Sequence, residues 1–143
     1  MTMPENIRGA VVALQIAGWM NIIGIPASTR LFTDDVYFKM APITYSRPAL
    51  LLAWLAGYML VSTATSAPSS PKLLALYTLE KGYFAAAGFH WLATRSHTHR
   101  QELKALSPAT YRMFHLNGPV DGFWAIVFAF LLSRALKRSD PSA

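Results

Sequence analysis

The residues with the clearest potential for chemistry are ionisable side chains that lie beside or inside apolar stretches of the sequence. Asp121 directly precedes the apolar stretch 122–133, and His90 lies within the apolar stretch 82–94. A carboxylate that orients an imidazole is the minimum arrangement for acid–base catalysis. We therefore take Asp121 and His90 as candidate catalytic residues, with Glu80 as a third.

Transmembrane helices are the elements that must position these side chains. The 143-residue chain is 53% hydrophobic and only 14% charged, whereas a soluble domain carries roughly 25% charged residues. Residues 9–29 and 48–71 contain no charged side chain, and about 20 apolar residues suffice to cross a bilayer. A soluble helical bundle is the alternative, but stretches such as 22–25 and 50–55 are apolar on all sides, which a soluble amphipathic helix is not. The composition predicts an integral, multi-pass membrane protein.

The predicted fold is all-α, a single membrane domain over residues 1–143. Its four transmembrane helices are expected at 8–27, 48–66, 72–94 and 118–137. Pro26 is expected to close the first helix, Asn117 to cap the last and Pro119 to fall in its first turn. The tail 139–143 is expected to be disordered.

Two long connections, 28–47 and 95–116, are predicted on the same side of the bundle, here called the loop end. The termini and the short connection 67–71 belong to the opposite, terminal end. Seven Lys and Arg residues fall at the loop end and five at the terminal end. The positive-inside rule therefore does not fix the orientation, and the type of membrane stays open.

Charge and composition also limit the partners. The net charge of +6 fits anionic lipid headgroups better than nucleic acid, because no basic stripe is interleaved with aromatic residues. The absence of cysteine excludes a thiol nucleophile. His97 and His99 alone are too few for a metal site, and no phosphate loop or haem pattern is present. We expect membrane lipid and a lipophilic small molecule as partners, a homo-oligomer as a further possibility, and no cofactor or metal.

Helix rise predicts two polar layers within the bundle. At about 1.5 Å per residue, Asp121, His90 and Asn21 lie about 5, 6 and 9 Å from the loop end. Arg47 is expected to join this layer. Glu80 lies about 21 Å in, so it should be roughly 16 Å from Asp121, too far for a carboxylate pair. The deeper layer contains polar residues of the first and third helices: Gln15, Glu80 and Lys81.

The tryptophans also gather towards the loop end, one from each helix: Trp19, Trp54, Trp91 and Trp124. One interpretation is an interfacial girdle that faces lipid. The other is an aromatic-walled pocket that opens towards the loop end. In the second interpretation these four residues bind the apolar part of a ligand, while Asn21, Arg47 and Asn117 bind its polar group.

Each candidate catalytic residue also has a purely structural interpretation. Asp121 can stabilise the N-terminus of its own helix, and His90 can hydrogen-bond a backbone carbonyl. Glu80 can pair with Arg134, while Lys81 extends towards the terminal end. The sequence leaves both kinds of role open.

The layout resembles small four-helix membrane proteins of the DoxX-like group, over about residues 15–136. The resemblance rests on Arg47 leading the second helix, on Glu80 followed ten residues later by His90, and on Asp121 before an aromatic-rich run. The site composition is also similar to that of EXPERA, sterol-isomerase-like membrane domains. That similarity implies intramembrane acids and tryptophans acting on a lipophilic substrate.

The leading hypothesis is a membrane protein that binds a lipophilic small molecule, acting as an acid–base isomerase or cyclase. In this hypothesis Asp121, His90 and Glu80 handle protons. An oligomeric transporter or channel subunit that uses Glu80 as its proton or cation site is the first alternative. A non-catalytic membrane assembly factor is the second.

Overall fold

The computed structural model describes residues 5–40 and 43–139, and these residues contain helices but no strand. Four long helices form the body: α1 (Glu5–Ser28), α3 (Arg47–Ser62), α4 (Pro71–Thr94) and α6 (Pro108–Ser139). The short elements are α2 (Asp35–Met40), α5 (His97–Leu106) and the 3-10 turns η1 (Ile43–Tyr45) and η2 (Ala67–Ser69). The predicted all-α class is confirmed.

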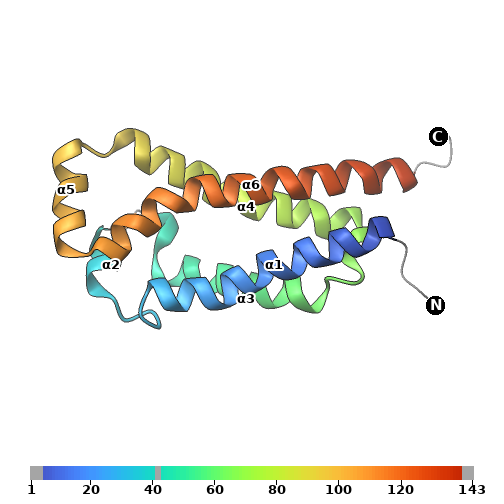
Figure 1. Ribbon diagram of the computed structural model, residues 1–143, viewed down its shortest axis with the longest axis horizontal. Coiled ribbons are helices and arrows are strands. Elements are labelled where there is room, and N and C mark those ends of the chain that lie inside the picture. Colours follow the sequence, from blue (N-terminus) through green and yellow to red (C-terminus); the bar gives the residue numbers. More distant parts are fainter. Residues whose placement is uncertain (1–4, 41–42, 140–143) are drawn as a thin grey trace.

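The long helices pack as two pairs, α4 on α6 and α1 on α3. Figure 1 shows an elongated bundle with α2 and α5 at one end and both termini at the other. This agrees with the predicted loop end and terminal end. The two long connections are largely helical, however, because α2, α5 and the start of α6 lie within them.

Local sequence explains where two of the helices begin. The Ser70 hydroxyl accepts a hydrogen bond from the Leu73 amide, and Pro71 occupies the first position of α4. Ser96 caps α5 in the same way, accepting from the His99 amide at 3.2 Å. Serine caps and first-turn prolines satisfy or remove amides that have no partner within the helix.

Two predicted helix boundaries are wrong, and so is the role predicted for Pro26. Pro26 lies inside α1 rather than closing it, and α3 ends at Ser62 instead of residue 66. The largest error concerns α6, which begins at Pro108, so that Asn117 and Pro119 are interior residues and not a cap and first turn. Packing on α4 outweighs the local helix-breaking tendency of these residues. Ser139 is the last residue of α6, and residues 140–143 of the predicted tail lie outside the described residues.

Glycines set the distance between the helices within each pair. A Cβ atom on Gly88 would lie 2.5 Å from the backbone nitrogen of Gly118, so the α4 and α6 backbones touch there. A Cβ atom on Gly57 would likewise lie 2.9 Å from the carbonyl oxygen of Gly18, where α3 crosses α1. Gly118 is therefore a contact residue and not the turn residue that its neighbour Pro119 suggests. Close approach through small residues is typical of helix packing in membranes.

A left-handed turn follows α1. Arg30, Leu31 and Phe32 have φ angles of 49°, 56° and 65°, in a region that costs a residue with a side chain about 1–2 kcal/mol. The turn is fixed by its neighbours, because the Phe32 amide donates to the Thr29 hydroxyl and the Leu31 amide donates to the Pro26 carbonyl. It redirects the chain into α2 at the loop end.

The outer surface of the bundle is apolar along all four long helices. Large side chains such as Ile23, Leu52, Leu79 and Ile126 are 63–72% exposed, one from each helix. Two stretches, Ile7–Ser28 and Pro108–Arg138, are long and apolar enough to cross a membrane, and only 28% and 17% of their most apolar segments are buried in the structure.

Candidate functional site

A cavity of about 230 Å³ lies between the four long helices, with α2 and η1 contributing at the loop end. Its apolar lining includes Leu50, Phe84 and Val120. Its polar lining comes from five different elements: Asn21, Ser28, Tyr37, Tyr45, Glu80, Lys81, Asn117 and Asp121. The volume exceeds that of a roughly 150 Å³ cavity known to admit benzene, and it is smaller than a typical pocket of about 300–1,000 Å³ for drug-sized ligands.

Lys81 is the centre of the polar lining. Its Nζ donates to Asn21 Oδ1 at 2.9 Å and to Asp121 Oδ1 at 3.1 Å, joining α4 to both α1 and α6. Glu80 Oε1 lies 3.5 Å from the same Nζ. Asn21 is itself oriented by a hydrogen bond of 2.9 Å from its Nδ2 to the Ala53 carbonyl on α3. One ammonium thus links three helices, and Asn21 extends the network to the fourth.

The predicted separation of Glu80 from Asp121 is therefore wrong. Both carboxylates form ion pairs with Lys81 Nζ, so they belong to one layer and not to two layers roughly 16 Å apart. The cause is the early start of α6. Asp121 lies more than three turns inside this helix, about 20 Å from its first residue, and so reaches the depth of Lys81.

Several buried polar atoms of the residues that line the cavity lack a hydrogen-bond partner among the described residues. They are both carboxylate oxygens of Glu80 and the hydroxyl of Tyr37. The Tyr45 hydroxyl differs, because it donates to the Phe84 carbonyl at 3.0 Å. Burial raises the pKa of both tyrosines well above the usual value, so each hydroxyl keeps its proton. The Glu80 oxygens and the Tyr37 hydroxyl are almost fully covered by their neighbours, so a molecule in the cavity contacts them only if those neighbours move.

Family models, curated proteins and solved structures contain no match to this chain. The resemblance to DoxX-like proteins stays a prediction.

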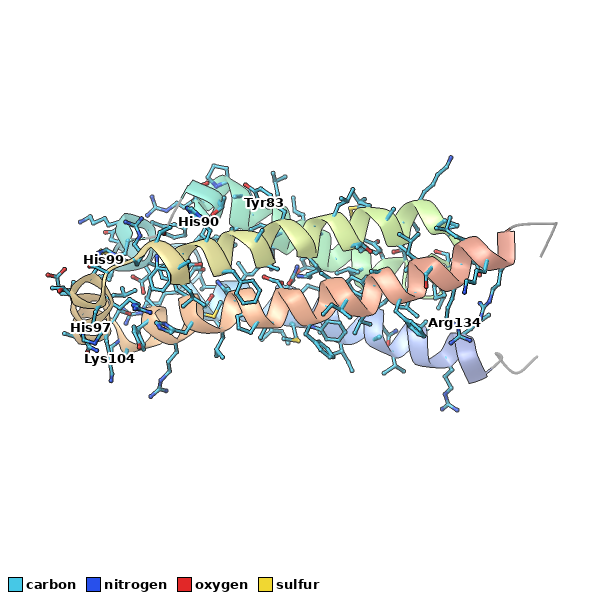
Figure 2. All side chains as sticks on the ribbon, turned by 90° about the horizontal axis from the view of Figure 1, so that it is seen from above. Tyr83, His90, His97, His99, Lys104 and Arg134 are labelled. Carbon is cyan, nitrogen blue, oxygen red and sulfur yellow. The ribbon has the colours of Figure 1, made fainter. Side chains whose placement is uncertain are left out.

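The predicted pairing of His90 with Asp121 is not formed. His90 is exposed, and Figure 2 shows it on the side of α4 that faces away from α6. It is not among the described residues that line the cavity, and its carbonyl accepts a hydrogen bond from Thr94. Lys81 occupies the position beside Asp121 that the sequence analysis assigned to His90.

Arg47 also lies outside the cavity. Its guanidinium forms an exposed ion pair with Asp35 at 3.2 Å, donates to the Phe32 carbonyl and stacks over the Phe38 ring at 4.6 Å. Arg47 therefore holds α2 against the start of α3. The structure gives it no contact with a ligand bound in the cavity.

The aromatic wall is not made of tryptophan. None of the four tryptophans, all within the described residues, lines the cavity. Trp19 lies half exposed on the outer surface, Trp54 donates to the Ile22 carbonyl at 3.1 Å, and Trp91 and Trp124 are buried in two separate core clusters. The predicted tryptophan pocket is wrong. The aromatic lining instead comes from Tyr37, Tyr45 and Phe84.

Four of the predicted site residues do meet at the cavity: Asn21, Glu80, Asn117 and Asp121. Sequence reasoning missed the central role of Lys81, which it placed in a different layer, and the contribution of Tyr37 and Tyr45. A lysine in the middle of an apolar segment is itself a signal, because such a charge normally faces the bundle interior and a partner. The tyrosines lie in a connection whose path the sequence does not define.

His97 and His99 lie on α5 at the loop end, away from the cavity (Figure 2). His97 Nε2 is 3.3 Å from the side-chain amide of Gln101. Among the described residues no group of three metal-ligating side chains occurs.

Proposed function

We propose that the four long helices cross a membrane and enclose a binding site for a small molecule with an apolar body. Support for the membrane comes from the outer surface. The exposed apolar side chains of all four helices would have to face water in a soluble protein, whereas Lys81 and Asp121, the charges near mid-bundle, point inward. Two of the helices meet the length and hydropathy expected of a membrane span.

The observation that carries the binding proposal is the Lys81 cluster at the wall of the cavity. Charged groups inside a membrane protein are costly and usually mark a functional site. Here Asn21, Lys81 and Asp121 form a fixed network, while the Glu80 oxygens and the Tyr37 hydroxyl are buried beside it without hydrogen bonds. A rigid network beside unused polar groups is typical of a ligand site with a few oriented contacts in an apolar lining.

An acid–base isomerase or cyclase reaction at this site would depend on Glu80. Asp121 accepts a hydrogen bond from Lys81, and His90 is outside the cavity. Glu80 is the carboxylate whose oxygens accept no hydrogen bond from the described residues, so it is the candidate proton acceptor once a side-chain movement uncovers those oxygens.

Topology can be tested directly because the sequence contains no cysteine. Single cysteines at Thr65, between α3 and α4, and at Ala105, on α5, occupy exposed positions at opposite ends of the bundle. In sealed vesicles an impermeant thiol reagent should label one of them and not the other. Equal labelling of both from outside would contradict the proposed four-span arrangement.

Ligand binding can be tested with a matched pair of variants on α6. Val120 lines the cavity, whereas Val127, two turns further along, is equally half-buried but is not among the lining residues. Val120→Phe should abolish saturable binding of benzyl alcohol in lipid nanodiscs, and Val127→Phe should preserve it. Equal binding by both variants would place the site elsewhere.

A second candidate function is a transporter or channel subunit that uses Glu80 as a proton or cation site. The observation in its favour is the lack of a hydrogen-bond donor on either Glu80 oxygen. Proton flux into liposomes that is lost in Glu80→Gln would support it. Flux equal to that of empty liposomes would exclude it.

A further inference from the structure

The cavity is closed by buried side chains on most of its sides. Its lining residues from α2, η1 and α3 are all buried, and so are Lys81 and Phe84 of α4. Two lining residues are exposed at the outer surface, Met20 of α1 and Leu116 of α6, at 43% and 56%. Among the described residues, the cavity therefore reaches the outer surface between α1 and α6. We call this place the lateral opening.

The α1 side of the lateral opening is formed by Met20, Gly24 and Ser28. Residues four apart lie on one side of a helix, so these three span about 12 Å along the helix axis. On the opposite side, α6 contributes Leu116 and Val120. A Cβ atom added to Gly24 would meet nothing within 4 Å. Gly24 therefore leaves space at the lateral opening that a larger side chain would fill.

The lateral opening faces the apolar outer surface of the bundle. Met20 and Gly24 also line a shallow groove on the outward side of α1, together with Ile16 and Ile23. The groove and the cavity therefore meet at these two shared residues. Met20 lies about 12 Å from Ser28, the last residue of α1. Under the proposed topology the lateral opening thus faces lipid inside the bilayer and not water at the loop end.

We propose that the cavity opens sideways into the membrane between α1 and α6, and that its ligand is an amphiphile that enters from the lipid. The side chains at the lateral opening are apolar at Met20, Leu116 and Val120, whereas the Lys81 network lies on the inner side. The polar end of the ligand therefore points inward, and an apolar chain longer than the cavity extends through the lateral opening. This inference rests on the proposed function, because it assigns a ligand class and an entry route to the same site.

The test compares benzyl alcohol with para-octylbenzyl alcohol on the full chain in lipid nanodiscs. Since benzene occupies a cavity of about 150 Å³, the cavity of about 230 Å³ holds benzyl alcohol but not an octyl chain as well. Binding is measured by calorimetry against empty nanodiscs, and each affinity is expressed per mole fraction of probe in the lipid. The two affinities should agree within about threefold, because the octyl chain stays in lipid before and after binding. A chain forced into water would weaken binding by more than about a hundredfold.

A pair of glycine variants on α1 then locates the entry route. Gly24→Leu should weaken the binding of para-octylbenzyl alcohol relative to benzyl alcohol by about tenfold, because the leucine side chain fills the lateral opening. Gly9→Leu should leave this ratio unchanged, since Gly9 also has no atom within 4 Å of the new Cβ but does not line the cavity. The ratio compares two probes on the same protein, so it does not depend on how much of a variant folds. An unchanged ratio in Gly24→Leu would overturn the inference.

Two results with the unaltered protein would also contradict the proposal. Binding of benzyl alcohol without binding of para-octylbenzyl alcohol would show that the cavity is closed to lipid, and would overturn the inference while leaving the ligand site intact. Binding of neither probe would overturn both the inference and the proposed function.

Discussion

Replacement of Lys81 by Met tests the buried network most directly. Met keeps a similar length but removes the ammonium, so Asp121 loses its hydrogen bond of 3.1 Å and Asn21 loses one of 2.9 Å. The Lys81 and Asp121 side chains are only 3% and 17% exposed, so water cannot replace these contacts fully. Hydrogen bonds to charged groups contribute about 1.5–3 kcal/mol each, and removal of one partner of a buried pair costs about 3–5 kcal/mol. We expect the free energy of unfolding to fall by about 3–5 kcal/mol.

The assay is equilibrium unfolding in mixed micelles. Added dodecyl sulfate unfolds the helices, and circular dichroism measures the loss of helix. Lys72→Met serves as the control, because Lys72 is an exposed lysine in the first turn of the same helix and should change stability by less than about 0.5 kcal/mol. In the Lys81→Met protein, a second change of Asp121→Asn should recover part of the loss, since it removes the charge left unpaired. A loss below about 1 kcal/mol in Lys81→Met would show that the network is solvated and would refute the reasoning.

Three further variants test other parts of the fold. Gly88→Ala should lower the free energy of unfolding by about 1–3 kcal/mol, because its Cβ meets the Gly118 backbone. Gly82→Ala has no atom within 4 Å of the new Cβ and should raise the free energy of unfolding by about 0.5–1 kcal/mol. A Gly88→Ala protein more stable than the Gly82→Ala protein would contradict the glycine contact. Leu31→Gly should raise the free energy of unfolding by about 0.5–1 kcal/mol in the same titration. It relieves the strain of a φ of 56°, and the side chain that it removes is 74% exposed. A lower free energy of unfolding would argue against the left-handed turn. Arg47→Met should lower the free energy of unfolding by less than about 1 kcal/mol, because both partners of its ion pair are more than half exposed. It should leave the binding of benzyl alcohol unchanged. Loss of binding would show that Arg47 contributes to the ligand site.

The helices could be predicted from the sequence because their signal is simple. Charge-free stretches at residues 9–29 and 48–71 correspond to α1 and α3, and Pro71 marks the start of α4. Such signals depend on residues that are neighbours in the chain. The start of α6 cannot be predicted from chain neighbours alone. Gly118 and Pro119 together are typical of a helix break, whereas in the fold Gly118 contacts Gly88 on another helix.

The site was predicted only in part for a related reason. Asn21, Glu80 and Asp121 stand out as polar groups within apolar segments, and all three line the cavity. Their predicted depths depend on where each helix ends, so a late start for α6 places Asp121 away from Lys81 and level with His90. Which side of α4 faces inward is a matter of packing, and Lys81 and His90 occupy different sides of that helix. A depth calculation alone does not show which of the two side chains faces the cavity.

The spacing of the Lys81 network along the chain has a consequence for biosynthesis. Asn21 precedes Lys81 by 60 residues, and Asp121 follows it by 40. Under the proposed topology the ribosome therefore delivers α4 to the membrane before the carboxylate of α6 exists. Glu80 is the only acidic residue in the α4 sequence, and it stands next to Lys81. The helix can thus enter the bilayer without net charge near its middle, and Asp121 later adds a second and closer carboxylate to Lys81.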